Sequence, residues 1–133
     1  MTDPLKIVLK AVDDKKAHDI VVLDISEIAT FAHYFVISSG DSSRQIQAVA
    51  DEVEAKMRER GYRPNHIEGY RNAEWILMDY HDLVVHVFSK KARAFYDLER
   101  LWRDGKSLDV EPLLARTIST PVMPGKVPRK KVK

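Results

Sequence analysis

The turn from Ser38 to Ser43 is the first segment of the chain whose residue types could carry chemistry. A strand that passes through small residues into a capped helix presents free backbone N–H groups, which can hold an anion. A nucleotidyltransferase would use such a Gly-Ser turn for a triphosphate, with paired carboxylates holding two metal ions. The alternative, which we favour, is that Ser42 only caps its helix, because Asp41 would repel a phosphate.

The carboxylates and histidines that follow are poorly arranged for catalysis or metal binding. Asp79 and Asp82 are three apart with a turn expected between them, whereas carboxylates that share a strand face are two apart. His81 and His86 are five apart and should project to opposite faces of the sheet, which disfavours a two-histidine metal site. The sequence therefore predicts no catalytic residue, no metal site and no cofactor.

Two further motifs are incomplete. The segment Gly105-Lys106-Ser107 ends like a phosphate-binding P-loop, but Arg100 stands where that motif requires a glycine. No Gly-x-Ser-x-Gly sequence is present, and the absence of cysteine excludes disulfides, thiolate ligands and a cysteine nucleophile. The sequence is not that of an enzyme with a recognisable mechanism.

Residue types that dominate binding hot spots are concentrated in one short stretch, which contains Trp75, Tyr80, Arg93, Tyr96 and Trp102. Trp102 stands in the apolar stripe of a predicted helix, so we expect it in the core. Trp75 and Tyr80 are five apart on one predicted strand and should face different environments. This stretch favours recognition of a partner over catalysis.

The hydrophobic periodicity predicts an α/β fold, a single domain with one mixed β-sheet flanked by helices. Strands are indicated by runs of β-branched residues and helices by apolar residues at helical spacing behind capping signals. The expected elements are a helix at 4–16, strands at 20–25 and 34–39, a helix from Ser42 to Gly61, a short strand at 66–68, a hairpin of 73–80 and 83–88, and a helix after Ser89 with Phe95, Leu98, Leu101 and Trp102 in its apolar stripe. Three helices of this size should cover only one face of the sheet fully, which leaves the other for a partner.

The charges divide the chain into two parts. The composition, 44% hydrophobic and 32% charged, is typical of a globular protein. Residues 1–115 carry 16 basic and 20 acidic side chains, a net charge of −4, whereas residues 116–133 carry +6 and contain three prolines. We predict a folded domain over 1–115 and a disordered basic tail over 116–133. No run is long enough to span a membrane and no leader is recognised, so we expect a cytoplasmic protein.

The segment from Ala73 to Phe88 and its continuation from Arg93 to Trp102 resemble the ribosomal silencing factor family, also called RsfS or Iojap-like. The earlier segments Asp19–Asp24 and Tyr34–Gln45 resemble it as well. Together these segments extend from about Leu5 to Gly105 in order and with close spacing, which is more specific than one short motif. His81 is a departure, because the family usually has glycine there, where positive φ would be easy to adopt.

The resemblance implies a nucleotidyltransferase-like fold without the catalytic carboxylates. It also implies binding to the large ribosomal subunit through the fourteenth universal large-subunit protein, which blocks joining of the small subunit and represses translation when nutrients are scarce. The residues to which the family's contact role is carried over are Trp75, Tyr80, His86, Arg93, Tyr96 and Glu99.

Beside the ribosomal silencing factor, two alternative functions and one additional contact remain as hypotheses. The runner-up is a nucleotidyltransferase-type enzyme acting on a nucleotide or RNA substrate. A homodimer built on the exposed face of the sheet is the third class. The basic tail from Arg116 is further expected to make a weak, salt-sensitive contact with ribosomal RNA.

Overall fold

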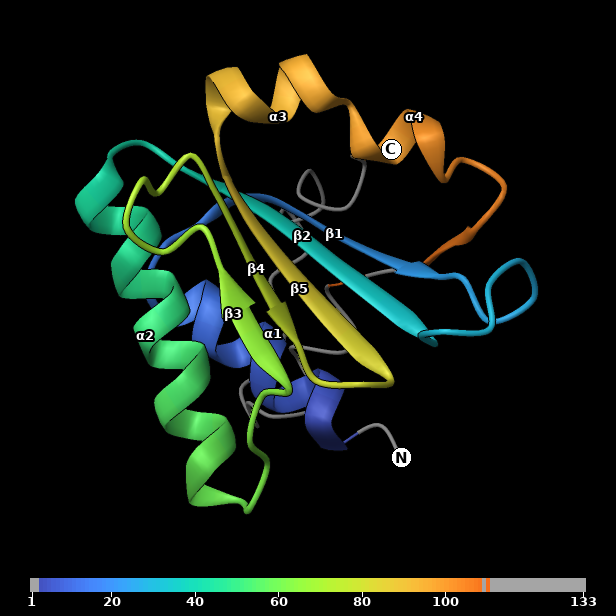
Figure 1. The fold of residues 1–133 in the computed structure, drawn as a ribbon, viewed down its shortest axis with the longest axis horizontal. Helices are drawn as coiled ribbons and strands as arrows, with labels where there is room; N and C mark the ends of the chain where they lie inside the picture. Colours follow the sequence, from blue (N-terminus) through green and yellow to red (C-terminus); the bar gives the residue numbers. More distant parts are fainter. Residues whose placement is uncertain (1–2, 109, 111–133) are drawn as a thin grey trace, which may run out of the picture.

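The computed structural model describes residues 3–108 and 110, which form one mixed sheet with its helices. The elements follow the chain in the order α1 (Asp3–Asp14), β1 (His18–Asp24), β2 (Tyr34–Gly40), α2 (Ser43–Glu59), β3 (His66–Glu68), β4 (Trp75–Asp79), β5 (Leu83–Ser89), α3 (Lys90–Tyr96), α4 (Leu98–Leu101) and β6 (Lys106–Leu108) (Figure 1). The predicted α/β class is confirmed. The nucleotidyltransferase-like character stays a prediction, and the predicted tail lies outside the described residues.

The six strands lie in the order β3-β4-β5-β2-β1-β6. The central pair, β2 and β5, is parallel, and the other pairs are antiparallel, as expected for a mixed sheet. Strand β6, which pairs with β1 through Lys106, Ser107 and Leu108, was not predicted from the sequence. This strand is too short and too polar to show a period of two, so backbone pairing with β1 rather than its own pattern defines it.

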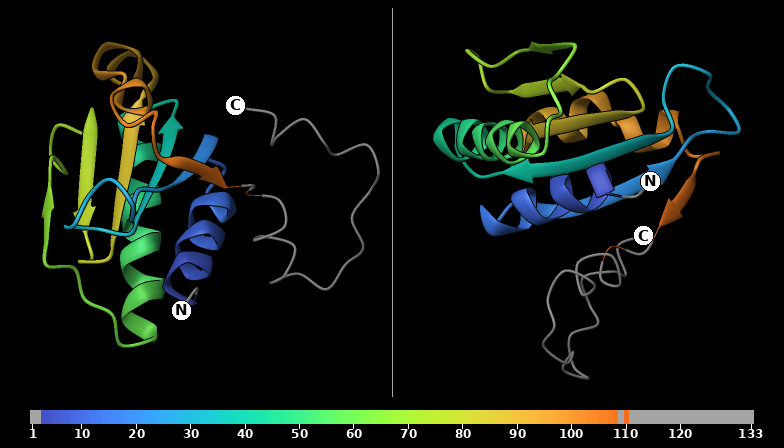
Figure 2. Two further views of the ribbon diagram at one scale, coloured as in Figure 1. Left: turned by 90° about the vertical axis from the view of Figure 1, so that its right-hand side faces the viewer. Right: turned by 90° about the horizontal axis from the view of Figure 1, so that it is seen from below.

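One face of the sheet is covered by α1 and α2, which pack against each other (Figure 2). Their apolar stripes explain this, because Leu5, Val8, Leu9 and Val12 of α1 are all 2% exposed or less. The capping signals of α2 are confirmed, since the Ser42 hydroxyl accepts a hydrogen bond from the backbone N–H of Gln45 at 3.0 Å. This larger core contains alternate residues of the central strands, among them Val36, Val85 and Met78.

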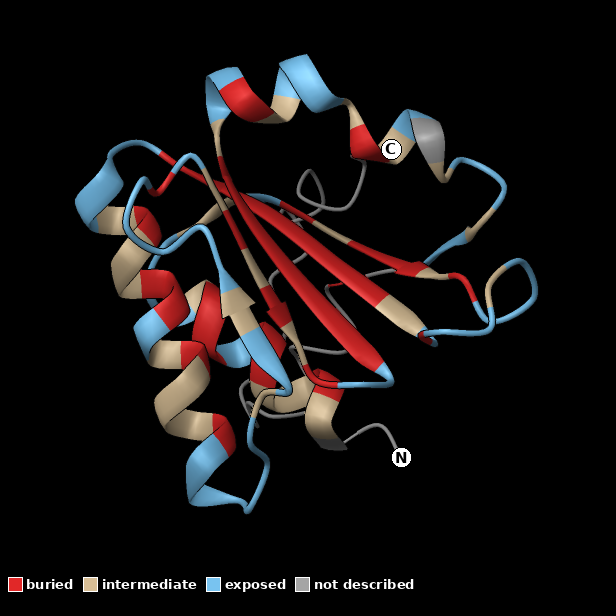
Figure 3. Ribbon diagram, viewed as in Figure 1, coloured by how far each residue is buried: buried red, intermediate tan, exposed pale blue. Residues whose placement is uncertain are grey.

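The opposite face is covered at one end only. Figure 1 looks onto this face, with α1 behind the sheet and with α3 and α4 along the end where β5 finishes. The smaller core beneath these two helices includes Phe35, Phe88 and Leu98. The middle strands are nearly continuous in their burial, as Figure 3 shows, whereas Trp75 and Leu77 of β4 remain partly exposed. The prediction that the helices would cover one face and leave part of the other open is confirmed.

The predicted continuous helix after Ser89 is wrong. The Asp97 backbone has φ of 48°, in the left-handed region, so α3 ends there and α4 begins in a new direction. The break changes the expected apolar stripe: Leu98 is buried, but Phe95 is 78% exposed. Apolar periodicity alone does not reveal a left-handed residue at a non-glycine position.

The turn between β4 and β5 contains His81, the position at which this sequence differs from the family's usual glycine. His81 has φ of 72°, the region in which glycine is comfortable, and its backbone N–H donates to Oδ1 of Asp79 at 2.8 Å. The chain therefore adopts a positive φ at this position although it lacks the glycine.

Within residues 3–108 and 110, none of the helices has the length and apolarity that crossing a membrane would require.

Candidate protein-binding surface

Trp75 and His86 lie side by side on the open face, on β4 and β5. The indole Nε1 of Trp75 donates a hydrogen bond to Nδ1 of His86 at 3.1 Å. Because Nδ1 is the acceptor, the neutral ring carries its proton on Nε2. His86 is only 3% exposed, and burial lowers its pKa from 6.5 to about 3, so the ring is neutral at physiological pH. This residue holds the tryptophan in place from below.

Aromatic side chains extend from Trp75 to the outer surface of α3. The indole lies 5.0 Å from the ring of Phe88 and 4.7 Å from the ring of Tyr96, between centroids. Tyr96 in turn contacts Phe95 edge-on at 5.0 Å. Tyr96 is 49% exposed and Phe95 is 78% exposed. We call Trp75, Leu77, Phe95 and Tyr96 the aromatic surface.

Arg93 joins α3 to α4 and to the sheet. Its Nη2 donates to Oε2 of Glu99 at 2.6 Å, and its Nη1 donates to the hydroxyl of Ser39 at 2.8 Å. The Arg93 side chain is 12% exposed, and that of Glu99 is 33% exposed. Through these contacts Arg93 holds α3, α4 and β2 together.

The structure brings together five of the six residues predicted as contacts: Trp75, His86, Arg93, Tyr96 and Glu99. Tyr80 does not join them, because the alternation along the β4 strand turns it to the face covered by α2. It is 8% exposed, its buried hydroxyl has no hydrogen-bond partner within the described residues, and burial raises its pKa to about 12. The different environments expected for Trp75 and Tyr80 are confirmed.

Three partly or fully exposed residues on this side were not predicted from the sequence: Leu77, Phe95 and Phe31. Leu77 could have been found, because it shares its strand face with Trp75. Phe31 could not, because it lies in the loop before β2 and has no periodic neighbours. Phe31 is 59% exposed and contacts Trp102 at 5.8 Å, while Trp102 packs against Phe35 at 5.3 Å. Trp102 contributes to the smaller core but remains partly exposed.

In the turn that was considered as an anion site, the carboxylate of Asp41 contacts two neighbouring side chains. Oδ2 of Asp41 lies 2.8 Å from Nε2 of His18, and Oδ1 lies 3.1 Å from Nζ of Lys90. Hydrogen bonds from His18 and then Lys90 lower the pKa of Asp41. His18 and Lys90, the two groups beside this turn that could face a phosphate, therefore contact Asp41 instead.

Asp79 and Asp82 do not form a metal-binding pair. Asp79 is occupied by the turn, and its Oδ2 lies 3.7 Å from Nδ1 of His66. Within the described part of the chain, no group of three His, Asp or Glu side chains is placed to hold a metal ion.

Comparisons with known proteins agree on one family. The family model described as ribosomal silencing factor during starvation matches residues 1–130. The chain is 41% identical over 111 residues to the ribosomal silencing factor RsfS of Halalkalibacterium halodurans, which covers 84% of this chain and 95% of that protein. It is 44% identical over 107 residues to RsfS of Bacillus subtilis, covering 80% and 91%. A crystal structure of a Chromobacterium violaceum protein is similar with a TM-score of 0.75 and 36% identity, covering 77% of this chain and 85% of that one.

Proposed function

Because the chain belongs to the ribosomal silencing factor family, we propose that it binds the large ribosomal subunit through the fourteenth universal large-subunit protein and blocks joining of the small subunit. Family membership itself supports a ribosome-associated repressor of translation. The relatives are named as silencing factors rather than as enzymes. The partner and the steric step are our inference. Repression when nutrients are scarce is also part of the proposal, and it is supported by the description of the matching family, a silencing factor during starvation.

The aromatic surface is the observation that carries this proposal. Phe95 and Tyr96 are adjacent large aromatic side chains with about half or more of their area exposed, and such clusters are typical of protein-binding surfaces. The hydrogen bond to His86 and the contacts with Phe88 and Tyr96 hold the Trp75 ring in place. A partner therefore meets a surface that needs little reordering, which reduces the entropic cost of binding.

Charge supports a basic protein as the partner. Residues 1–115 carry a net charge of −4. On β3 and β4, Glu68 is paired in register with Leu77 and therefore lies beside the aromatic surface. An acidic group beside an apolar centre complements a basic partner and raises its association rate. Ribosomal proteins are commonly basic.

The mechanism needs no bond to be made or broken. A folded domain that occupies the subunit interface excludes the other subunit, and its effect depends on its concentration and its dissociation constant. Trp75, Leu77, Phe95 and Tyr96 would supply the contact area. His86, Arg93 and Glu99 would hold these residues in position from below.

Sedimentation with purified ribosomal subunits tests the proposal. We expect the protein to sediment with the large subunit and to reduce the fraction of joined ribosomes. Phe95→Ala should weaken this binding without affecting folding, because the side chain is 78% exposed. Tyr70→Ala, which removes a 41% exposed aromatic side chain elsewhere, is the matched control. Equal binding by both variants and by Trp75→Ala would contradict the assignment of this surface.

The partner is tested separately with the purified fourteenth universal large-subunit protein. We expect a direct complex that Trp75→Ala weakens. Binding to the large subunit without binding to this protein would overturn the choice of partner.

A measurement of mass in solution tests the homodimer. If the second copy and the ribosomal protein bind the same aromatic surface, they would compete for it.

The basic segment 116–133 is proposed to add a contact with ribosomal RNA. Its charge of +6 would displace counterions from phosphates, so its contribution should fall as salt rises. Deleting residues 116–133 should lower both the affinity for the subunit and its salt dependence. Unchanged affinity and unchanged salt dependence would exclude this contact.

For the enzyme alternative, the pairing of Asp41 with His18 and Lys90 gives no support.

A further inference from the structure

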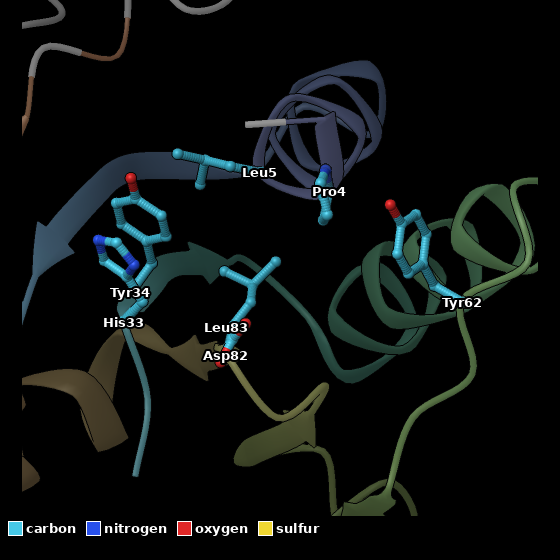
Figure 4. Close-up of a pocket in the computed structure, with 7 residues that line it drawn as sticks. All are labelled: Pro4, Leu5, His33, Tyr34, Tyr62, Asp82 and Leu83. Carbon is cyan, nitrogen blue, oxygen red and sulfur yellow. The ribbon is translucent and has the colours of Figure 1, made fainter. Parts of the chain in front are cut away.

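A pocket of about 490 Å³ lies at the end of β5 that is remote from α3, away from the aromatic surface. Leu5 of α1, Tyr34 at the start of β2 and Leu83 at the start of β5 line it, together with His33, Tyr62 and Asp82. Figure 4 shows the rings of His33 and Tyr34 together on one side and the ring of Tyr62 on the other, with Leu83 between them. None of these residues has a role in the proposed binding to the ribosomal protein.

The walls of this pocket suit a flat aromatic ligand. The rings of His33 and Tyr34 are stacked, with centroids 4.1 Å apart and planes inclined by 11°. Leu5 and Leu83 are 2% and 3% exposed and form an apolar floor. Protein aromatic rings bind nucleobases by stacking, which is worth about 1–3 kcal/mol for each base.

The end of α2 fixes the backbone at Tyr62. Gly61 has φ of 89° and donates its backbone N–H to the carbonyl of Arg58 at 3.0 Å. The N–H of Tyr62 donates to the carbonyl of Met57 at 2.9 Å. These two bonds form a Schellman motif, which fixes the direction of the chain after the helix. The Tyr62 side chain is 38% exposed, so its ring remains available to a ligand.

The charges near the pocket suit a nucleotide rather than an apolar ring. Arg63 follows Tyr62 directly in the chain, outside the pocket lining; it is exposed and pairs with no carboxylate in the described part of the chain. Arginine side chains of this kind bind phosphate. Asp82 is also exposed and forms no ion pair with a described residue. A carboxylate accepts hydrogen bonds from base N–H groups, and guanine presents two neighbouring donors, N1–H and N2–H.

We propose that this pocket binds a guanine nucleotide, with the base against Tyr62 and Tyr34, its N–H groups on Asp82, and its phosphate outside the pocket, within reach of Arg63. Two sources share this chemistry: a free nucleotide and an unpaired guanosine in RNA. The site is independent of the aromatic surface, so it adds a second ligand to a protein that works at the ribosome.

The experiment titrates the full-length protein with GMP, AMP and UMP, and with the pentaribonucleotide UUGUU, while NMR follows the rings and methyl groups that line the pocket. We expect shifts at Tyr34, Tyr62 and Leu83, with GMP bound about tenfold more tightly than AMP or UMP, as two base-specific hydrogen bonds would give. Tighter binding of UUGUU than of GMP identifies RNA as the source, and the reverse identifies the free nucleotide.

Variants separate the site from adventitious binding. Tyr62→Ala should weaken GMP binding at least about tenfold through the loss of stacking, whereas Tyr70→Ala should not. Asp82→Asn should remove the preference for guanine while leaving the fold intact. The proposal is overturned if no probe shifts the pocket signals, or if Tyr62→Ala binds GMP as the parent protein does. Trp75→Ala should retain nucleotide binding, so failure of this site and failure of the ribosomal assignment are distinguishable.

Discussion

Nε1 of Trp75 donates a hydrogen bond to Nδ1 of His86, so a partly exposed tryptophan is fixed by a histidine that is 3% exposed. The bond requires His86 to stay neutral, because a protonated ring has no acceptor. Burial ensures this by lowering the pKa of His86 to about 3. Order in the aromatic surface is thereby linked to the protonation of one buried side chain.

This linkage predicts that the protein loses stability in mild acid. The unfolded chain binds a proton at His86 below its usual pKa of 6.5, whereas the folded chain does not until about pH 3. The stabilising contribution is therefore present above pH 6.5 and is lost as the pH falls towards 3. Between pH 7 and pH 5 the free energy of unfolding should fall by about 2 kcal/mol from this group.

Urea denaturation at a series of pH values measures this effect. His86→Phe should flatten the slope between pH 7 and pH 5. His33→Gln, at an exposed histidine, should retain most of it. An unchanged slope in His86→Phe would mean that other groups cause the pH dependence.

The turn at His81 should be improved by glycine. At φ of 72° a side chain meets the neighbouring backbone, a cost that glycine lacks. His81→Gly should therefore raise the free energy of unfolding by up to about 1 kcal/mol. Thermal unfolding of this variant and of Asp82→Gly, where φ is not positive, provides the comparison, and a lower melting temperature for His81→Gly than for the parent would contradict it.

Gly69 should be essential to the edge of the sheet that carries Trp75. It has φ of 81°, and a Cβ there would come within 2.1 Å of the carbonyl oxygen of Trp75. Gly61 has φ of 89°, but a Cβ added to it would meet no atom within 4 Å. Gly61→Ala should lower the free energy of unfolding by about 1 kcal/mol through backbone strain alone. Gly69→Ala should have the same backbone cost and a further loss of about 1–3 kcal/mol through overpacking. Equal losses in denaturation experiments would refute the steric explanation.

The ion pair of Arg93 and Glu99 should hold α3 and α4 in place. Arg93→Gln removes the charge and leaves a partly buried carboxylate, so we expect a loss of about 2 kcal/mol. Arg100→Gln is the control, because that side chain is 74% exposed and lies 4.0 Å from Asp97, and it should leave stability nearly unchanged. Chemical denaturation of the two variants distinguishes them, and a similar small effect for both would assign Arg93 a surface role.

Much of the fold follows from local patterns in the sequence. The β-branched run of β1 and the capped amphipathic pattern of α2 are determined by residues close together in the chain, so they can be predicted without tertiary information. The missed elements are those defined by distant partners. β6 exists because its backbone pairs with β1, and the break at Asp97 places Leu98 in the smaller core.

The features of the candidate surface also separate into those that the sequence predicts and those that only the tertiary structure shows. Residue types and strand alternation alone place Trp75 and Tyr80 on opposite faces, and they identify Arg93 and Tyr96 as binding types. Only the tertiary structure shows that α2 covers the Tyr80 face, that His86 supports Trp75, and that Arg93 pairs with Glu99. The physical reason is that burial and pairing depend on groups brought together from separate elements, whereas periodicity depends on neighbours along the chain.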